Sequence, residues 1–319
     1  MEWVFGKQLT FEEKALKLFQ LQAQNCEPYK QYLGLLNTDI ASVNSINDIP
    51  FLPIEFFKSH KILSNRNTIV KTFNSSGTTS QELSQHHLTD LKLYEDSFTK
   101  GFNHFYGNPQ DYRILALLPS YLEREGSSLV YMCQHLIEKS KHPESGFYLH
   151  NLEELAQVLR QKSDKKTLLI GVSYALLDLA EQHPLRLENT IVMETGGMKG
   201  KRKEMIKSEL HKVLKEAFRL NSIHSEYGMT ELLSQAYSKG NGIFETPPWM
   251  KIKVRDAQDP LTLLGYQETG GINIIDLANI NSCSFIATQD LGKSISENSF
   301  ELKGRFELSD IRGCNLLVQ

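Results

Sequence analysis

Between Tyr112 and His224, segments with the pattern of buried strands alternate with segments that have the pattern of helices. Each strand-like segment is a short apolar run, and the helix-like segments place apolar residues three and four positions apart. Alternation of this kind favours a parallel sheet with helices on its faces. The expected strands are 113–118, 167–170, 190–193 and 220–224, and the expected helices are 128–139, 175–181 and 203–218.

The N-terminal region is expected to be helical. Thr10-Phe11-Glu12-Glu13 has the pattern of a capping box, in which Thr10 caps the helix and Glu13 reaches back to it. Thr89 is predicted to cap a later helix whose aromatic residues fall on one face, which is typical of core packing; they are Tyr94, Phe98, Phe102 and Phe105.

After Pro247-Pro248 the helical patterns fade, and strand-like segments follow at 250–254, 271–275 and 283–288. We therefore expect an α/β fold with two parts. Residues 1–246 form a large region with a mostly parallel sheet flanked by helices, and residues 247–319 form a smaller β-rich region.

Composition and charge exclude several classes of protein. The chain has 319 residues, 40% apolar and 23% charged, which is ordinary for a globular protein with a buried core. The formal net charge is −3, so the charge balance does not favour binding to nucleic acid or to an acidic membrane surface. Charged residues interrupt the N-terminal segment 1–20, which is typical of neither a signal peptide nor a membrane span.

The four cysteines show no Cys-x-x-Cys pair and no zinc-binding spacing; they are Cys26, Cys133, Cys283 and Cys314. Free thiols in a reducing compartment are the simplest interpretation. We therefore expect a cytoplasmic protein.

Asn74-Ser75-Ser76-Gly77-Thr78-Thr79-Ser80 is the first segment with a chemical signature. Gly77 permits a close approach between the backbone and a ligand. Ser75, Ser76, Thr78 and Thr79 offer hydroxyl and backbone N–H donors, which is the equipment of an anion-binding loop.

The second segment is Tyr227-Gly228-Met229-Thr230-Glu231. Glu231 offers a hard carboxylate suited to Mg²⁺, and Thr230 offers a hydroxyl beside it. Tyr227 offers a flat face on which an adenine could stack, and Gly228 is expected to let the chain turn.

In this order along the chain, the two segments resemble the phosphate loop and the Tyr-Gly-x-Thr-Glu motif of the adenylate-forming enzymes. These enzymes activate carboxylic acids with ATP, and their large N-terminal domain is an α/β structure. The resemblance implies ATP and Mg²⁺ as cofactors, with Thr230 and Glu231 as catalytic residues and Glu231 as the metal ligand.

Three further segments resemble parts of the same superfamily. Thr288-Gln289-Asp290-Leu291-Gly292, expected to follow a strand, is similar to the segment whose Asp binds the ribose hydroxyls. Gly304-Arg305 is similar to the Gly-Arg at the family's hinge, where the Arg reaches the ribose or the phosphate. Thr195-Gly196-Gly197 falls where the family has a Gly-Gly turn beside the adenine, which implies a nucleotide-binding role for Gly196 and Gly197.

A narrower resemblance is to the acyl-protein synthetases of the LuxE type, and it spans most of the chain from about residue 48. The segments that carry it are 49–58, 118–121 with 126–129, and 309–317. Members of this branch activate a fatty acid as acyl-AMP and pass the acyl group to a cysteine thiol, within a complex that reduces fatty acids to aldehydes. The resemblance implies a fatty or other carboxylic acid substrate and an acyl-accepting protein or reductase as partner.

The chain departs from the wider superfamily in three places. Ser80 stands where glycine is usual, and Gln81-Glu82-Leu83-Ser84 replaces the segment in which a lysine commonly follows the loop. The chain ends at Gln319, so the superfamily's C-terminal lid domain is expected to be absent, as it is in the narrower branch.

Cys314 is the candidate acyl acceptor, since the narrower family has such a cysteine near its C-terminus. Arg312 is close enough in sequence to favour the thiolate, which would attack acyl-AMP as a nucleophile. The alternative is a small buried hydrophobic residue packed with Leu316 and Leu317.

Two other functions compete with this interpretation. Gly171-Val172-Ser173-Tyr174-Ala175 approximates the nucleophile elbow of the α/β-hydrolases, and Ser173 with His224 and Glu188 or Glu194 would make an esterase or acyltransferase. Against it, Ala175 replaces the second glycine of the elbow. The other alternative is a nucleotide-binding subunit whose activity has decayed.

Overall fold

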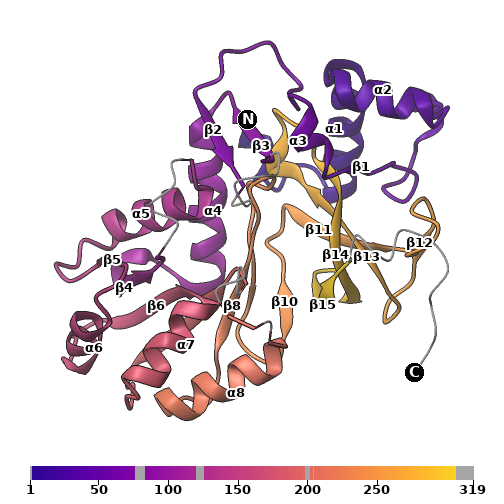
Figure 1. The fold of residues 1–319 in the computed structure, drawn as a ribbon. Helices are drawn as coiled ribbons and strands as arrows, with labels where there is room; N and C mark the ends of the chain where they lie inside the picture. The colour runs from indigo at the N-terminus through magenta and orange to yellow at the C-terminus, as the bar shows by residue number, and fades with distance from the viewer. Residues whose placement is uncertain (1, 76–82, 120–125, 198–201, 204, 307–319) are drawn as a thin grey trace.

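The computed structural model describes residues 2–75, 83–119, 126–197, 202–203 and 205–306 (Figure 1). Within these residues one sheet of 13 strands runs through the molecule in the order β12-β11-β13-β14-β15-β10-β9-β8-β7-β6-β4-β5, and β1 pairs with β14 off this path. The strands β2 and β3 form a separate two-stranded sheet. The α/β fold class predicted from the sequence is confirmed.

The half of the sheet from β5 to β8 is parallel. Helices connect its strands, as the sequence alternation predicts, and Figure 1 shows them around this half. The strands are β4 (Tyr112–Leu117), β5 (Gly146–Tyr148), β6 (Lys166–Val172), β7 (Thr190–Thr195) and β8 (His224–Tyr227). The helices are α5 (Ser128–Ser140), α6 (Leu152–Arg160), α7 (Ser173–Gln182) and α8 (Lys207–Phe218).

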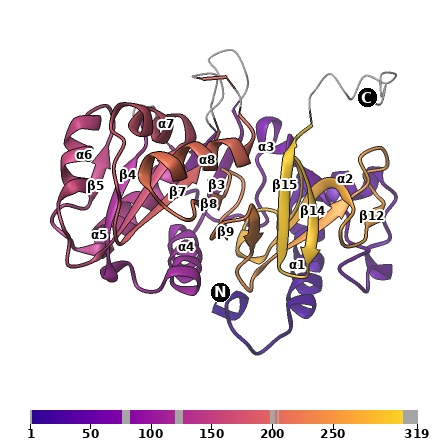
Figure 2. The same cartoon turned by 90° about the horizontal axis from the view of Figure 1, so that it is seen from below.

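The other half of the sheet, from β8 to β12, is antiparallel. Its strands are β9 (Ala236–Ser238), β10 (Ile243–Glu245), β11 (Met250–Arg255), β12 (Leu263–Leu264), β13 (Thr269–Asp276), β14 (Phe285–Ser296) and β15 (Ser299–Arg305). Figure 2 shows the two halves side by side, with α5 to α8 around the first and α1 and α2 beside the second.

The N-terminal part contributes α1 (Phe11–Asn25), α2 (Glu27–Leu35), β1 (Leu52–Pro53), α3 (Phe56–Ser59), β2 (Lys71–Asn74), β3 (Gln85–Leu88) and α4 (Leu91–Tyr106). The capping box at the start of α1 is confirmed. The Thr10 hydroxyl accepts from the Glu13 amide at 3.2 Å, and the Glu13 carboxylate accepts from the Thr10 amide at 2.7 Å.

Two predicted helix starts were wrong. Helix α4 is capped by Asp90, whose carboxylate accepts from the Lys92 amide at 3.0 Å, because the Thr89 hydroxyl is engaged with the Asn65 amide group instead. Helix α8 begins at Lys207 rather than Lys203. It buries Leu210, His211, Leu214 and Phe218, while Ile206, directly before its first residue, is 65% exposed.

Two predicted strands also have different bounds. Leu220 is not in a strand, because its amide donates to the Lys215 carbonyl at 3.1 Å and so closes helix α8. Strand β8 therefore begins at His224 and includes Tyr227. Strand β14 continues to Ser296 because it pairs with β13 on one side and with β15 on the other, so Asp290 lies inside a strand rather than after it.

The N-terminal helices pack against strands from the far end of the chain. The Phe19 and Tyr29 rings contact the Phe285 ring of β14, and the Gln22 side-chain amide donates to the Asn279 carbonyl at 3.0 Å. The division into 1–246 and 247–319 stays a prediction. Among the described helices, none combines the length and the apolar character needed to cross a membrane.

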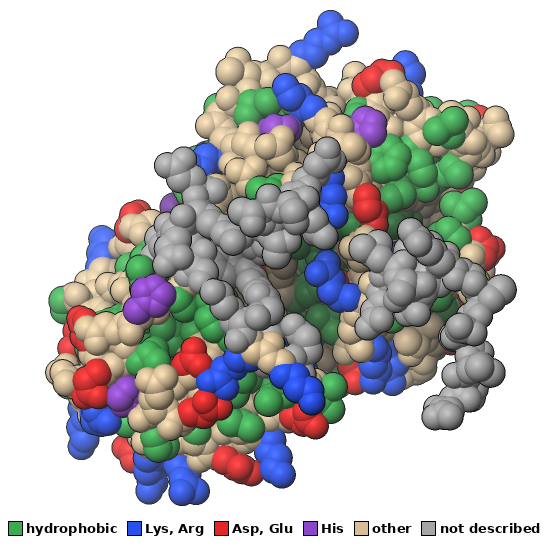
Figure 3. Space-filling view, in the orientation of Figure 1, with side chains coloured by type: hydrophobic (Ala, Val, Ile, Leu, Met, Phe, Trp, Pro, Cys, Tyr) green, Lys and Arg blue, Asp and Glu red, His purple; other side chains and the backbone are tan. Residues whose placement is uncertain are grey.

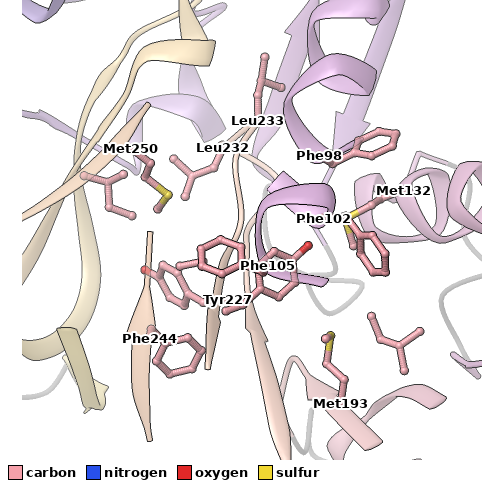
Figure 4. Close-up of a cluster of buried hydrophobic side chains, with 14 of the residues drawn as sticks. Phe98, Phe102, Phe105, Met132, Met193, Tyr227, Leu232, Leu233, Phe244 and Met250 are labelled. Carbon is pink, nitrogen blue, oxygen red and sulfur yellow. The ribbon is translucent and has the colours of Figure 1, made fainter. Parts of the chain in front are cut away.

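The core beneath the parallel half includes the aromatic stripe predicted on α4. Phe98 and Phe102 are at most 1% exposed, and Figure 4 shows them beside Met132 of α5. On the other side of the same close-up, Tyr227 and Phe244 form part of the apolar layer under the antiparallel half. These two layers hold strand β8, which carries the Tyr-Gly motif, between the two halves of the sheet.

Candidate functional site

The carboxyl ends of the parallel strands β7 and β8 bring two predicted segments together. Thr195 ends β7, and its hydroxyl donates to the carboxylate of Glu226 on β8 at 2.5 Å. Gly196 follows with a φ of 65°, a left-handed conformation that favours glycine, and its carbonyl accepts from the Ser173 hydroxyl at 3.2 Å. The Thr195-Gly196-Gly197 turn therefore lies beside the Tyr-Gly motif, as open α/β sheets place ligand-binding loops.

Gly228 is needed for a reason that the sequence did not suggest. Its φ is not in the left-handed region, so the expected freedom to turn is not what it provides. A Cβ at this position would clash with the carboxylate oxygen Oε1 of Glu226. Glycine thus lets the backbone of the motif pass directly over the Glu226 carboxyl group.

Tyr227, Asp290 and Arg305 form one chain of polar contacts, a hydrogen bond followed by an ion pair. The Tyr227 hydroxyl donates to Oδ2 of Asp290 at 2.8 Å, and Nε of Arg305 lies 3.1 Å from Oδ1. Asp290 and Arg305 also face each other across the β14–β15 pair. Three residues from separate sequence motifs therefore meet at one point, with Asp290 largely buried and Arg305 largely exposed to solvent.

The Tyr227 ring is buried, and its neighbours include Phe244 and Phe300, whose rings meet it edge to face at 6.0 and 5.4 Å between centroids. Burial raises the pKa of its hydroxyl, and the Asp290 charge raises it further, so the phenol stays protonated as a donor. Stacking of an adenine on this ring stays a prediction.

Glu231 is buried, and burial raises the pKa of its carboxyl group. The Ser84 hydroxyl and the residue's own backbone amide oppose this rise by hydrogen bonding, and the charges of Arg305 and Lys58 oppose it further. Ser84 ends the segment that follows the hydroxyl-rich loop, so the end of that segment and the Thr-Glu motif are in direct contact.

The base of that loop is fixed by the hairpin of β2 and β3. The Ser75 amide donates to the Ser84 carbonyl at 2.9 Å, and the Ser84 amide donates to the Ser75 hydroxyl at the same distance. The predicted phosphate-binding residues Ser76, Gly77, Thr78 and Thr79 lie outside the described residues, as does Cys314.

The turn that carries Glu231 is held by two residues that sequence reasoning missed. The Asp276 carboxylate accepts from the Leu233 and Ser234 amides at 3.0 and 2.9 Å and from the Ser234 hydroxyl at 2.6 Å. The Asn279 side chain donates to the Glu231 carbonyl at 2.7 Å. The signal in the sequence was an Asp directly after the predicted strand 271–275, which is typical of a strand end with a capping carboxylate.

The predicted hydrolase residues are not arranged for that chemistry. A serine nucleophile requires a histidine as its base, with an acid behind the histidine. In the described structure the Ser173 hydroxyl donates to Glu194 at 3.3 Å and to the Gly196 carbonyl, while the His224 ring is bonded to the Tyr106 hydroxyl at 3.1 Å. Ser173 thus supports the Gly196 turn.

Glu194, which accepts from Ser173, also supports the Gly196 turn, and it is a buried anion. Burial opposes its ionisation, but Lys207, His211 and Ser225 outweigh that effect, and the pKa of Glu194 falls to about 2. The ion pair with Lys207 joins the start of helix α8 to the end of strand β7.

The pKa of Glu226 predicts a pH dependence of stability. Burial raises this pKa to about 7, and the neighbouring Glu194 charge adds to the rise. The unfolded carboxyl loses its proton near pH 4.5, whereas the folded one keeps it to about pH 7, so the free energy of unfolding falls as the pH rises through this window. Glu226→Gln has no proton to lose and should escape this fall, gaining on the order of 3 kcal/mol over the wild type by pH 8.

Urea unfolding of both proteins at several pH values between 4.5 and 8 measures this difference. The exposed Glu188→Gln is the control and should show no such trend. If the difference in the free energy of unfolding between Glu226→Gln and the wild type does not change with pH, the raised pKa of Glu226 is contradicted.

Comparison with known proteins shows which solved structures share this fold. No protein-family model and no curated protein matches the sequence. Among solved structures, an open conformation of 2-hydroxyisobutyryl-CoA ligase in complex with 2-HIB-AMP and CoA superposes with a TM-score of 0.69 at 11% identity, over 92% of this chain and 68% of that one. The two proteins share a fold.

Two further structures agree. ATP-bound MatB from Rhodopseudomonas palustris gives a TM-score of 0.55 at 13% identity, and an ATP-bound RpMatB-BxBclM chimera gives 0.58 at 13%. Each of these matches covers 76% of this chain. The chain spans about half the length of these two proteins, 49% in both cases.

Proposed function

We propose that this protein activates a carboxylic acid with ATP to form acyl-AMP and then transfers the acyl group to a thiol. One observation carries the proposal. Tyr227 bonds to Asp290, Arg305 pairs with Asp290 and its charge also acts on Glu231, and Glu231 contacts Ser84 at the base of the hydroxyl-rich loop. Phosphate, metal and ribose groups of one nucleotide require that proximity.

In the first step a carboxylate oxygen of the acid forms a bond to the α-phosphorus of ATP, and the bond from that phosphorus to pyrophosphate breaks. The loop that begins at Ser75 supplies hydroxyl and amide donors to the phosphates. Asp290 keeps lone pairs beyond those used by Tyr227 and Arg305, and it accepts hydrogen bonds from the ribose hydroxyls.

The residues fit a magnesium ion bound through ATP. Mg²⁺ in such sites uses one or two carboxylates together with substrate phosphates, rather than a cage of protein ligands. The described residues contain no group of three His, Cys, Asp or Glu side chains that could form such a cage, and Glu231 is a buried carboxylate beside the loop. Glu231 would hold the ion, which supplies charge neutralisation at the phosphates.

The closer assignment is an acyl-protein synthetase of the LuxE type that acts on a fatty acid, with Thr230 at the reaction centre and an acyl-accepting protein or reductase as partner. The segments quoted from the sequence support this narrower proposal. Gly196 and Gly197 then line the adenine side of the site, since their turn lies beside the Tyr-Gly motif.

The test of the proposed function is ATP–pyrophosphate exchange measured with a series of fatty acids. Exchange that depends on the added acid is the expected result. ATP binding without exchange under any acid would instead indicate a decayed nucleotide-binding subunit. Hydrolysis of a fluorogenic ester that is lost in Ser173→Ala would indicate the hydrolase.

The second half of the reaction predicts a labelled thioester on Cys314. Cys26, Cys133 and Cys283 are buried, and burial raises the pKa of each thiol, that of Cys26 to about 11, so they are poor nucleophiles. With ATP and a labelled acid, the wild type should acquire hydroxylamine-labile label, and Cys314→Ala should lose most of it. Cys26→Ala is the matched control, and full labelling of Cys314→Ala would exclude Cys314 as the acceptor.

A further inference from the structure

The turn that carries Thr230 and Glu231 depends on other elements of the fold for its orientation. The Leu232 amide donates to the Met229 carbonyl at 3.1 Å, which closes a β-turn. Its two central residues are Thr230 and Glu231. The carbonyls of these central residues have no donor within the turn, and a carbonyl that is shielded from water must find a donor elsewhere. The donors that meet them therefore set how the two peptide groups are oriented, and with them both side chains.

Each of these two carbonyls is bonded to a side chain from a different part of the chain. Nδ1 of His86 lies 2.9 Å from the Thr230 carbonyl oxygen, and the Asn279 side-chain amide donates to the Glu231 carbonyl at 2.7 Å. His86 belongs to strand β3, whereas Asn279 lies between strands β13 and β14. The turn is thus held by two elements that are far apart in the sequence.

The His86 ring is fixed by further contacts. It is 1% exposed, and the Phe57 ring of α3 meets it edge to face at 5.5 Å between centroids. Its other nitrogen, Nε2, lies 3.0 Å from the Ser282 hydroxyl. Burial lowers the pKa of His86 to about 4, so the ring is neutral and carries a single N–H. Because a carbonyl oxygen only accepts, that proton is on Nδ1, and Nε2 accepts from the Ser282 hydroxyl.

The position of His86 along its strand brings it to the motif together with Ser84. Ser84 and His86 are buried while Gln85 between them is exposed, so the two side chains lie on the same face of the segment. Ser84 contacts the Glu231 carboxylate, and His86 contacts the Thr230 carbonyl. Two successive inward-facing side chains therefore meet the two central residues of the turn.

We propose that His86 is a positioning residue, which donates from Nδ1 to the Thr230 carbonyl and so holds Thr230 and Glu231 in the orientation that acyl activation needs. This inference rests on the proposed function, in which Thr230 lies at the reaction centre and Glu231 holds Mg²⁺. Because the His86 ring is buried, it acts through Thr230 and does not touch the substrate.

Variants that keep one ring nitrogen position at a time separate this role from packing alone. Asn places its amide nitrogen where Nδ1 of His86 lies, whereas Gln reaches the position of Nε2 and fills more of the volume of the ring. In acid-dependent ATP–pyrophosphate exchange at saturating ATP and Mg²⁺, His86→Ala and His86→Gln should each lose about 10–100-fold in rate, as is usual when a residue that orients a metal ligand is removed. His86→Asn should stay within about threefold of the wild type. Packing alone predicts the opposite order, with Gln closer to the wild type than Asn.

Ser282→Ala is the matched control, because it removes the other hydrogen bond of the His86 ring and leaves the one to Thr230. Its exchange rate should stay within about threefold of the wild type. Thermal unfolding midpoints should fall in all four variants, since each loses a buried contact, and exchange is measured well below the lowest midpoint.

Three results would overturn the role of His86 and leave the proposed function standing. They are exchange by His86→Ala within about threefold of the wild type, equal recovery in His86→Gln and His86→Asn, and a loss in Ser282→Ala as large as that in His86→Ala. A wild type that shows no exchange with any acid would overturn the proposed function, and the role of His86 with it.

A second readout needs neither ATP nor Mg²⁺. The ring ¹⁵N chemical shifts of the free wild type at pH 7 should show the His86 proton on Nδ1, because the hydrogen bond to Thr230 sets which nitrogen carries it. Neutral imidazole in water carries its proton mainly on Nε2, and exposed histidines such as His104 provide that reference; Figure 3 shows His side chains at the surface in purple. The His86 signals are identified by their loss in His86→Asn. A proton on Nε2 of His86 would overturn the contact on which the role depends.

Discussion

Replacing Glu231 with glutamine is expected to lower acid-dependent ATP–pyrophosphate exchange by about 10²–10³-fold, and in any case by more than about tenfold. The amide has nearly the same size as the carboxyl group but lacks its charge, and an anionic magnesium ligand stabilises the developing charge by several kcal/mol. Glu231 is buried and its pKa is raised by that burial, so a neutral side chain should not destabilise the fold. Initial exchange rates at saturating ATP measure the effect.

Two controls separate chemistry from folding in this experiment. Glu188→Gln changes an exposed carboxylate that lies in a salt bridge with Arg186, and it should retain full exchange. Thermal unfolding of Glu231→Gln should give a midpoint equal to that of the wild type or higher. Exchange by Glu231→Gln within about threefold of the wild type would remove Glu231 from the proposed role.

Replacing Asp276 with alanine is expected to lower the free energy of unfolding by about 3–4 kcal/mol. Its carboxylate is fully buried and serves four donors: the amides of Leu233, Ser234 and Ala278, and the Ser234 hydroxyl. Alanine would remove the acceptor of the Ser234 and Ala278 amides, while the Leu233 amide keeps the Asn279 side-chain oxygen, and each buried donor without an acceptor costs about 1–3 kcal/mol, with incomplete additivity. Denaturation with urea, followed by circular dichroism, measures the change.

Asp276→Asn retains the volume of the side chain and one acceptor oxygen, so its destabilisation should be smaller than that of the alanine variant. Asp164, whose side chain is 82% exposed, is the matched control, and Asp164→Ala should change stability by less than about 0.5 kcal/mol. A loss below about 1 kcal/mol in Asp276→Ala would show that the turn carrying Glu231 does not depend on this carboxylate.

The sequence alone located most elements of the parallel half of the fold, but strand β5 and helix α6 were not predicted. Strands β4, β6 and β7 and helices α5 and α7 lie where the alternating apolar patterns placed them, because those patterns report burial on one face of each element. The antiparallel strands β11 and β13 were also located. Element ends were less certain, as at Leu220 and Thr89, because capping there depends on contacts with other parts of the chain.

Short sequence motifs were likewise enough to identify several residues of the candidate site. The Tyr227 and Asp290 segments were selected for their residue types and their order along the chain, and the structure joins them by a hydrogen bond. Their roles in binding and catalysis stay predictions. Glu226, His86 and Asp276 were missed, because a single Glu, His or Asp within a strand or turn has no local pattern that marks its partner.

The sequence by itself determined where the main strands and helices of the parallel half lie, since periodicity and capping act over a few neighbouring residues. Only the tertiary structure decided that Asp276 holds the turn carrying Glu231, that Gly228 makes room for Glu226, and that Asp290 faces Arg305 inside a sheet. These relations join residues far apart in the chain. They are set by the packing of whole elements and by the hydrogen bonds that buried polar groups must find, and no single segment encodes either of these.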